Sequence, residues 1–179
     1  MASKKVNSNL VDLKAIVEQS KKYEEILPHT LSNGMDIEYF PHFSKTKLDE
    51  IIEEYQRYAQ SEDKEDKKFM EVVTKDDTSI VLFWQFLAVK KFTHFGEQMK
   101  KIKKVSSLSP YFYALLETGI LQEIANDVFD FNEMNKVNKL FANQVALITA
   151  VMEYTEELDG QLETYRDKFK ETLKGNIDA

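Results

Sequence analysis

The sequence predicts a mainly α-helical protein, a helical bundle of about six helices with a short β-hairpin near the N-terminus and a long C-terminal helix. Three observations predict this fold class. The 179 residues include only five glycines and three prolines, too few for a sheet protein with many tight turns. Apolar residues recur at intervals of three and four in several segments. These segments begin or end at capping residues, proline or glycine, as helices do.

Residues 1–60 are expected to form an N-terminal module of helix, hairpin and helix. The first helix is predicted from about residue 9 to 27, with Ser8 or Asn9 as its cap and Pro28 at its end. Asn33-Gly34 then predicts a hairpin turn, because both residues tolerate positive φ and apolar residues alternate around them. A second helix is predicted over residues 45–60 after the capping residue Ser44.

Residues 61–78 are predicted to be a charged linker between this module and a main helical domain, residues 79–179. The linker interpretation rests on residues 61–68, SEDKEDKK, which contain no apolar side chain. In the main domain, Ser109-Pro110 predicts the start of a helix, and Gly119 divides the helical segments on either side of it.

The most apolar stretch runs from Ile80 to Val89, where Gln85 is the single polar residue. A bilayer span needs about 20 apolar residues, so this stretch is too short to cross a membrane. Its apolar side chains are spread around the whole helical circumference, so the helix must be covered on all sides. Either the rest of the chain covers it entirely, or another chain covers part of it. The sequence leaves both alternatives open.

The C-terminal part, from about residue 132, has the most regular helical periodicity. Its apolar positions, spaced alternately by three and four, predict a seam that faces one long helix of this chain or of a partner. Gly160 is a candidate break in this helix, because glycine costs about 1 kcal/mol relative to alanine inside a helix. The seam comprises Met134, Val137, Phe141, Gln144, Ile148, Val151, Thr155, Leu158, Leu162, Tyr165 and Phe169.

No catalytic, cofactor-binding or metal-ligating residues are predicted. The chain has no cysteine, and its three histidines, His29, His42 and His94, are far apart in sequence. Phosphate-binding glycine loops and the nucleophile-elbow motif are absent. Adjacent acidic residues point about 100° apart on a helix, so they do not converge on a metal ion. We therefore expect a protein that is not an enzyme and needs no cofactor.

A basic band lies between Lys90 and Lys104, where there are six lysines and one glutamate. It is the feature that could bind nucleic acid, as a row of phosphate contacts. However, the band contains no arginine for base readout, and the whole chain carries a net charge of −7. Lysines near the end of a helix also favour the negative end of its dipole. The net charge and the absence of arginine from the band therefore do not favour nucleic acid as a partner.

From about Ile80 to Val145 the pattern resembles the helical tail assembly chaperones of long-tailed bacteriophages. An apolar helix, IVLFWQFLAVKKFT, is followed by the segments YALLETGILQEI and NEMNKVNKLF. The resemblance implies a non-enzymatic protein that escorts a tape-measure-like helical protein, assists the tail tube protein to assemble around it, and can self-associate. The residues matching the pattern are Phe83, Trp84, Phe86, Leu87, Phe92, Thr93, Leu115, Leu116, Gly119, Leu121 and Ile124.

The expected function is thus a phage tail assembly chaperone in the host cytoplasm, with no membrane segment. The start of the chain lacks the apolar core and cleavage site of a secretory signal. The alternatives are a nucleic-acid-binding regulator that uses the basic band and a phage structural component retained in the particle. The candidate partner-binding residues are Phe83, Trp84, Phe86, Leu87, Phe92, Val151, Leu158, Leu162, Tyr165 and Phe169.

Overall fold

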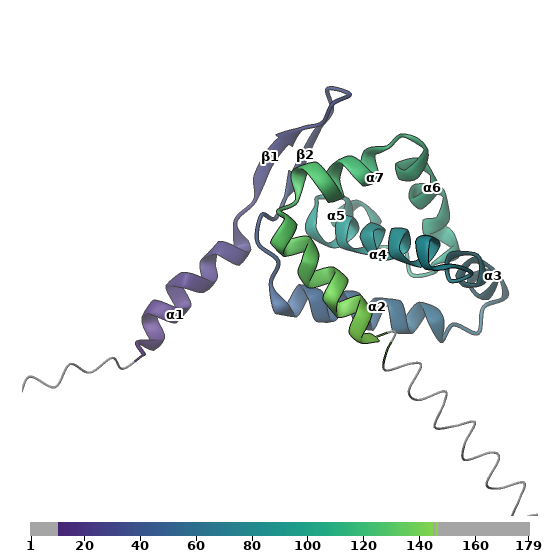
Figure 1. Cartoon of the computed structure of the whole chain (residues 1–179), viewed down its shortest axis with the longest axis horizontal. Coiled ribbons are helices and arrows are strands. Elements are labelled where there is room, and N and C mark those ends of the chain that lie inside the picture. Colours follow the sequence, from purple (N-terminus) through teal and green to yellow (C-terminus); the bar gives the residue numbers. More distant parts are fainter. Residues whose placement is uncertain (1–10, 145, 147–179) are drawn as a thin grey trace, which may run out of the picture. The chain divides into compact units, whose positions relative to one another are not determined.

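The computed structural model describes residues 11–144 and 146, and it is mainly α-helical, as the sequence predicts (Figure 1). The chain divides into two compact units, Met1–Val137 and Asn138–Ala179. The described part of the second unit, residues 138–144 and 146, is helical. The first unit contains a two-stranded sheet and helices, in the order α1 (Leu13–Ser20), β1 (Leu27–Thr30), β2 (Asp36–Tyr39), α2 (Lys45–Ala59), α3 (Lys64–Val73), α4 (Asp77–Phe92), α5 (Phe95–Met99), α6 (Ser109–Glu117) and α7 (Ile120–Glu123).

Helix α4 forms the centre of the first unit. It begins after Asp76, whose carboxylate accepts a hydrogen bond from the Ser79 N–H at 2.8 Å. Helices α2, α3, α5 and α7 all contact α4, and so does the π-helical turn Ile124–Val128. These neighbours enclose most of its apolar residues: Phe83, Phe86 and Leu87 are fully buried, whereas Val81 is 36% exposed. The structure therefore supports the first alternative for this stretch, in which the chain itself covers the helix.

Helix α2 begins at Lys45 after the cap Ser44, as predicted, but the predicted linker 61–78 is wrong for most of its length. Residues 64–73 form α3, which is capped by Asp63 and buries Phe69, Met70 and Val73. The charged residues at the start of α3 lie mainly on its exposed face, so the absence of apolar residues in the first eight positions gave a false boundary. The compact unit continues through this segment.

The hairpin predicted at Asn33-Gly34 is present. Strands β1 and β2 pair antiparallel, with Leu27 opposite Tyr39 and Thr30 opposite Asp36. Gly34 has φ +82°, a conformation that favours glycine. The helix before the hairpin is shorter than predicted, because α1 ends at Ser20, a 3₁₀ turn (Lys21–Glu24) follows, and Pro28 lies within β1 instead of ending a helix.

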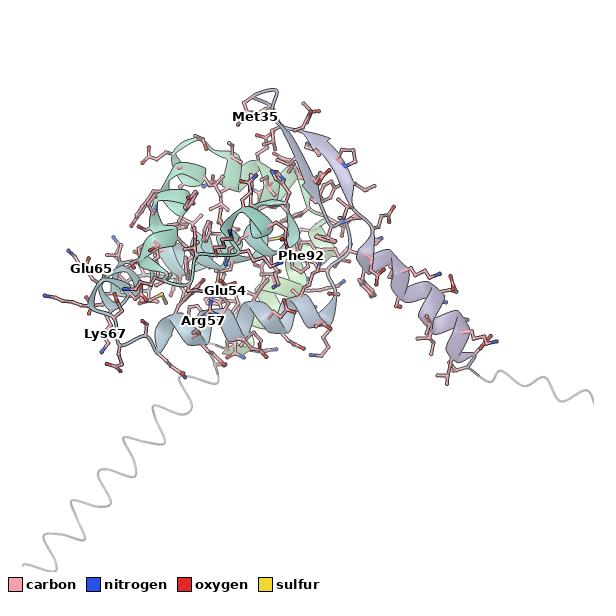
Figure 2. All side chains as sticks on the ribbon, turned by 180° about the vertical axis from the view of Figure 1, so that it is seen from behind. Met35, Glu54, Arg57, Glu65, Lys67 and Phe92 are labelled. Carbon is pink, nitrogen blue, oxygen red and sulfur yellow. The ribbon has the colours of Figure 1, made fainter. Side chains whose placement is uncertain are left out.

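The hairpin is fixed to the helices at both of its ends. The Phe40 N–H donates to the Phe92 carbonyl, and the His94 N–H donates to the Glu38 carbonyl, each at 2.9 Å. At the loop between the strands, where Met35 lies (Figure 2), the Ser32 N–H and hydroxyl donate to the Glu123 carboxylate at 2.5 and 2.9 Å. The chain between β2 and α2 therefore passes next to the C-terminal end of α4.

Two glycines shape the second half of the unit. Gly119, with φ +73°, separates α6 from α7, as the sequence predicts. Gly96 lies in α5, where a Cβ atom would be 2.6 Å from the carbonyl oxygen of Lys90. Residues 131–144 are helical, in agreement with a C-terminal helix from about residue 132. The predicted break at Gly160 lies outside the described residues.

Replacement of Phe86 by alanine should lower the free energy of unfolding by about 3–5 kcal/mol, because it leaves a cavity beside Phe83 and Phe112 in the enclosed core. Val81→Ala is the matched control on the same helix, since Val81 is 36% exposed. Urea unfolding followed by circular dichroism measures both. Equal losses in the two variants would contradict the central position of this face of α4.

Gly96→Ala should also destabilise the protein, by about 1–3 kcal/mol, because the added methyl group meets backbone that cannot move freely. At an exposed helical glycine the same substitution would instead stabilise the protein, by about 1 kcal/mol. Gln98→Ala, at an exposed position of α5, provides the control. A rise in the melting temperature of Gly96→Ala would show that α5 does not approach α4 this closely.

Candidate protein-binding surface

Helix α1 carries an apolar stripe that the first unit does not cover. Its residues Leu13, Ile16 and Val17 remain exposed by 76%, 47% and 60%, and Val11, two residues before the helix, is exposed by 74%. The Leu13, Ile16 and Val17 positions are spaced as on one face of a helix, and α1 has no buried residue. We call these four residues the α1 stripe. Several exposed apolar side chains on one helical face indicate a surface that another protein covers.

The energetics of the α1 stripe favour binding without making it strong. Each of its side chains would contribute roughly 1.5–3 kcal/mol on full burial. Association itself costs about 4–15 kcal/mol in lost freedom of motion. An isolated helix of eight residues is also marginal in water, so a partner that packs against the stripe would stabilise α1 itself. A firmly bound partner needs further contacts beyond the α1 stripe.

The structure corrects half of the predicted partner-binding residues. Five of them are core residues with at most 2% exposure, so they cannot contact another chain in this fold: Phe83, Trp84, Phe86, Leu87 and Phe92. They were selected because their helix is apolar on every side, and the physical reason for that composition is enclosure by neighbouring helices. The other five lie outside the described residues: Val151, Leu158, Leu162, Tyr165 and Phe169.

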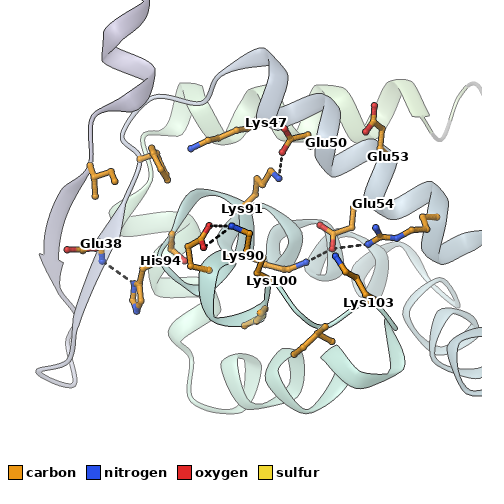
Figure 3. A pocket seen from close by; sticks show the side chains of 18 residues that line it. Glu38, Lys47, Glu50, Glu53, Glu54, Lys90, Lys91, His94, Lys100 and Lys103 are labelled. Carbon is orange, nitrogen blue, oxygen red and sulfur yellow. Dashed lines mark hydrogen bonds and ion pairs between the residues drawn. The ribbon is translucent and has the colours of Figure 1, made fainter.

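A cleft of about 780 Å³ lies between α2 and the C-terminal end of α4, with α5 and the chain after it on the other side (Figure 3). We call it the α2–α4 cleft. Glu50 and Glu53 line it from α2, and Lys100 and Lys103 line it from the opposite side. Lys47 and Arg57 also line it from α2, so the cleft carries charges of both signs, and Ile26, between α1 and β1, adds an apolar side chain.

A buried ion pair joins α2 to α4 at the cleft. The Lys90 ammonium and the Tyr58 hydroxyl both donate hydrogen bonds to Glu54, and the Arg57 guanidinium lies 3.6 Å from the same carboxylate. The Lys90 and Glu54 side chains are only 10% and 14% exposed. Burial opposes ionisation of Glu54, but Lys90 in particular outweighs it and holds the pKa of this carboxyl below its ordinary value. Burial and the Glu54 charge raise the pKa of Tyr58.

The basic band is largely neutralised by carboxylates. Within the described part of the chain, four of its six lysines form ion pairs, namely Lys90 with Glu54, Lys91 with Glu50, Lys100 with Glu97 and Lys104 with Asp63. Lysines that are held by carboxylates have less capacity to bind a row of phosphates, because binding would first have to break those pairs. The arrangement therefore argues against a nucleic-acid groove at this position.

The histidines have separate structural neighbours. His94 Nδ1 accepts a hydrogen bond from the Glu38 N–H at 3.2 Å, His42 Nδ1 lies 3.9 Å from Glu133, and the His29 ring is edge-on to Tyr39. Among residues 11–144 and 146, no group of histidine and acidic side chains is arranged to hold a metal ion. In the same residues, no helix is long and apolar enough to cross a membrane.

Sequence reasoning missed the α2–α4 cleft. Glu54 and Lys90 are 36 residues apart, and no motif links them, so their pairing could not be read from spacing. The α1 stripe did have a signal, the helical periodicity of residues 10–17. However, periodicity does not tell whether the apolar face of a helix is covered by its own chain.

A family model described as YomO matches residues 13–175 of the chain. The matched range begins at the first residue of α1 and includes the hairpin, helices α2 to α7 and the α2–α4 cleft. Searches of the curated proteins and of the solved structures gave no match. We therefore infer the function from the α1 stripe and the α2–α4 cleft.

The buried ion pair gives a pH-dependent prediction. Because the folded pKa of Glu54 lies below its ordinary value of 4.5, the pair stabilises the fold above about pH 4.5 and this contribution is lost as pH falls through the folded pKa. Glu54→Gln should cost up to about 3–5 kcal/mol at neutral pH, since it leaves the Lys90 charge buried without its anion.

The same variant should lose less stability than the wild type when pH is lowered from 6 through the folded pKa of Glu54, which lies below 4.5. Glu53→Gln, at an exposed position one residue away, should keep the wild-type profile. Urea unfolding across this range measures both effects. An unchanged stability of Glu54→Gln at neutral pH would show that the pair does not hold α2 on α4.

Proposed function

The chain belongs to the YomO family, which has a phage-associated name, and from this premise we propose that it is a non-enzymatic tail assembly chaperone. In this proposal it binds a long, tape-measure-like helical protein and assists the assembly of the tail tube around it. The single observation that carries the proposal is the α1 stripe, an apolar helical face that the compact unit leaves uncovered.

A helical partner suits the α1 stripe. Helices commonly bind one another through apolar residues spaced by three and four, which is the spacing of Leu13, Ile16 and Val17. A long coiled-coil-like protein would offer a complementary apolar seam. The net charge of −7 would help to keep such a complex in solution.

The resemblance to tail assembly chaperones supports this proposal only as a similarity of fold, because it does not identify a contact surface. The residues that match the pattern include Phe83, Phe86 and Leu121, which are fully buried and therefore describe the packing of the core. A contact surface has to be sought outside them. The α1 stripe precedes the matching segment and is available on the surface.

The two alternatives are distinguished by different observations. A regulator that binds nucleic acid is disfavoured by the ion pairs of the basic band. A structural component retained in the particle would use the same stripe, and mass spectrometry of finished particles tests it, because a chaperone should be absent from them.

The proposal predicts that co-expression with the tape-measure protein of the same phage increases the soluble fraction of that protein. Ile16→Glu should remove most of this increase and weaken binding at least tenfold, because it would bury a charge in the apolar contact. Ala15→Glu is the matched control, since it introduces the same charge at an exposed position on the side of α1 opposite the stripe.

Both variants should fold as stably as the wild type, because all residues of α1 are exposed. The proposal fails if the wild-type chain gives no increase in the soluble tape-measure protein. It also fails if Ile16→Glu and Ala15→Glu support the partner equally well.

A further inference from the structure

Lys47 is a half-buried cation in the α2–α4 cleft that has no ion pair with any described residue. Its ammonium nitrogen lies 2.8 Å from the centroid of the Phe40 ring, over an aromatic face. The neighbouring cation Lys91 differs, because it is paired with Glu50. Lys103, on the other side of the cleft, is a second cation with no ion pair among the described residues.

The surroundings of Lys47 make its charge costly. Burial and repulsion by Lys91 lower the pKa of Lys47, and the attraction of Glu50 only partly offsets them. An anion in the cleft would remove part of both costs, because it would solvate the ammonium and balance the repulsion. The cleft, at about 780 Å³, has room for such a group together with the apolar atoms that carry it.

We propose that the α2–α4 cleft binds a carboxylate at Lys47, and that this carboxylate is an Asp or Glu side chain of the helical protein partner. The identification of the partner rests on the proposed function, whereas the carboxylate site rests on Lys47, Phe40 and the cleft alone.

The carboxylates near Lys47 on α2 restrict the anion to a single group. Glu50 and Glu53 line the cleft from the same helix, so a strand of nucleic acid would bring further phosphates against two carboxylates. One side-chain carboxylate can lie at Lys47, while a basic residue of the same partner can lie near Glu53. The mixture of acidic and basic side chains that lines the cleft thus favours a protein segment of mixed charge.

The position of Ile26 connects this site to the α1 stripe. Ile26 is an apolar residue with 52% exposure, it follows α1 and the 3₁₀ turn in the chain, and it lines the cleft. A partner helix bound to the α1 stripe could therefore extend its apolar contact to Ile26 and place an acidic side chain in the cleft. The cleft would thus provide the further contacts that a firmly bound partner needs beyond the α1 stripe.

The carboxylate site is tested first with sodium acetate as the probe. NMR measures the pKa of the Lys47 ammonium in acetate and in chloride at equal ionic strength. The expected result is a higher pKa of Lys47 in acetate, because a bound anion favours the charged lysine, and no difference at Lys45, which pairs with Asp49 on the same helix. Equal pKa values of Lys47 in the two salts would overturn the site.

The partner assignment is tested with two synthetic helical peptides that carry a leucine seam and differ by one flanking Glu or Gln. The wild-type chain should bind the Glu peptide about tenfold more tightly at low salt. Lys47→Gln should abolish this preference, and Lys45→Gln should retain it. Fluorescence anisotropy gives the six dissociation constants.

The remaining outcomes separate the two proposals. Acetate binding without a preference for the Glu peptide would mean that the site takes a free small anion, which overturns the partner assignment. Failure of both peptides to bind would count against the proposed function. The acetate experiment would still show whether a carboxylate binds at Lys47. Binding of a single-stranded oligonucleotide that is lost in Lys47→Gln would overturn the inference in favour of nucleic acid.

Discussion

The enclosure of α4 is the constraint on which the rest of the structure depends. Its apolar residues are distributed around the whole helix, so no single neighbour could cover them. The chain therefore surrounds α4 with α2, α3, α5, α7 and the turn that follows α7. The most apolar segment of the sequence therefore lies in the core, where it cannot contact a partner protein. Among residues 11–144 and 146, the α1 stripe is an exposed apolar surface that remains available for binding.

The C-terminal end of α4 determines where the polar features lie. Lys90 pairs there with Glu54, and Phe92 and His94 bond to the backbone of Phe40, which follows β2, and of Glu38 in β2. These contacts hold α2 and the hairpin beside the end of α4, and the α2–α4 cleft forms between them and α5. The structural ion pair and the proposed carboxylate site at Lys47 are therefore products of the same packing.

Local signals in the sequence were sufficient for much of the fold. Asn33-Gly34 predicted the hairpin, Ser44 the start of α2, and Gly119 the division between α6 and α7, because each depends on the conformation or capping of a few neighbouring residues. Long-range effects were not predictable. The charged run before Phe69 looked like a linker, although Asp66 in it is buried and accepts hydrogen bonds from Ser106. The pairing of Lys90 and the exposure of α1 likewise depend on the whole fold.

The central claim is that α4 is interior and that the α1 stripe is the contact surface. Hydrogen–deuterium exchange of the chain, alone and in complex with its co-expressed helical partner, tests both parts at once. The account predicts that α4 amides exchange slowly in both states, since they lie in the packed core. It predicts that α1 amides exchange rapidly in the free chain and become protected in the complex. Unchanged exchange of α1, together with new protection in α4, would contradict it.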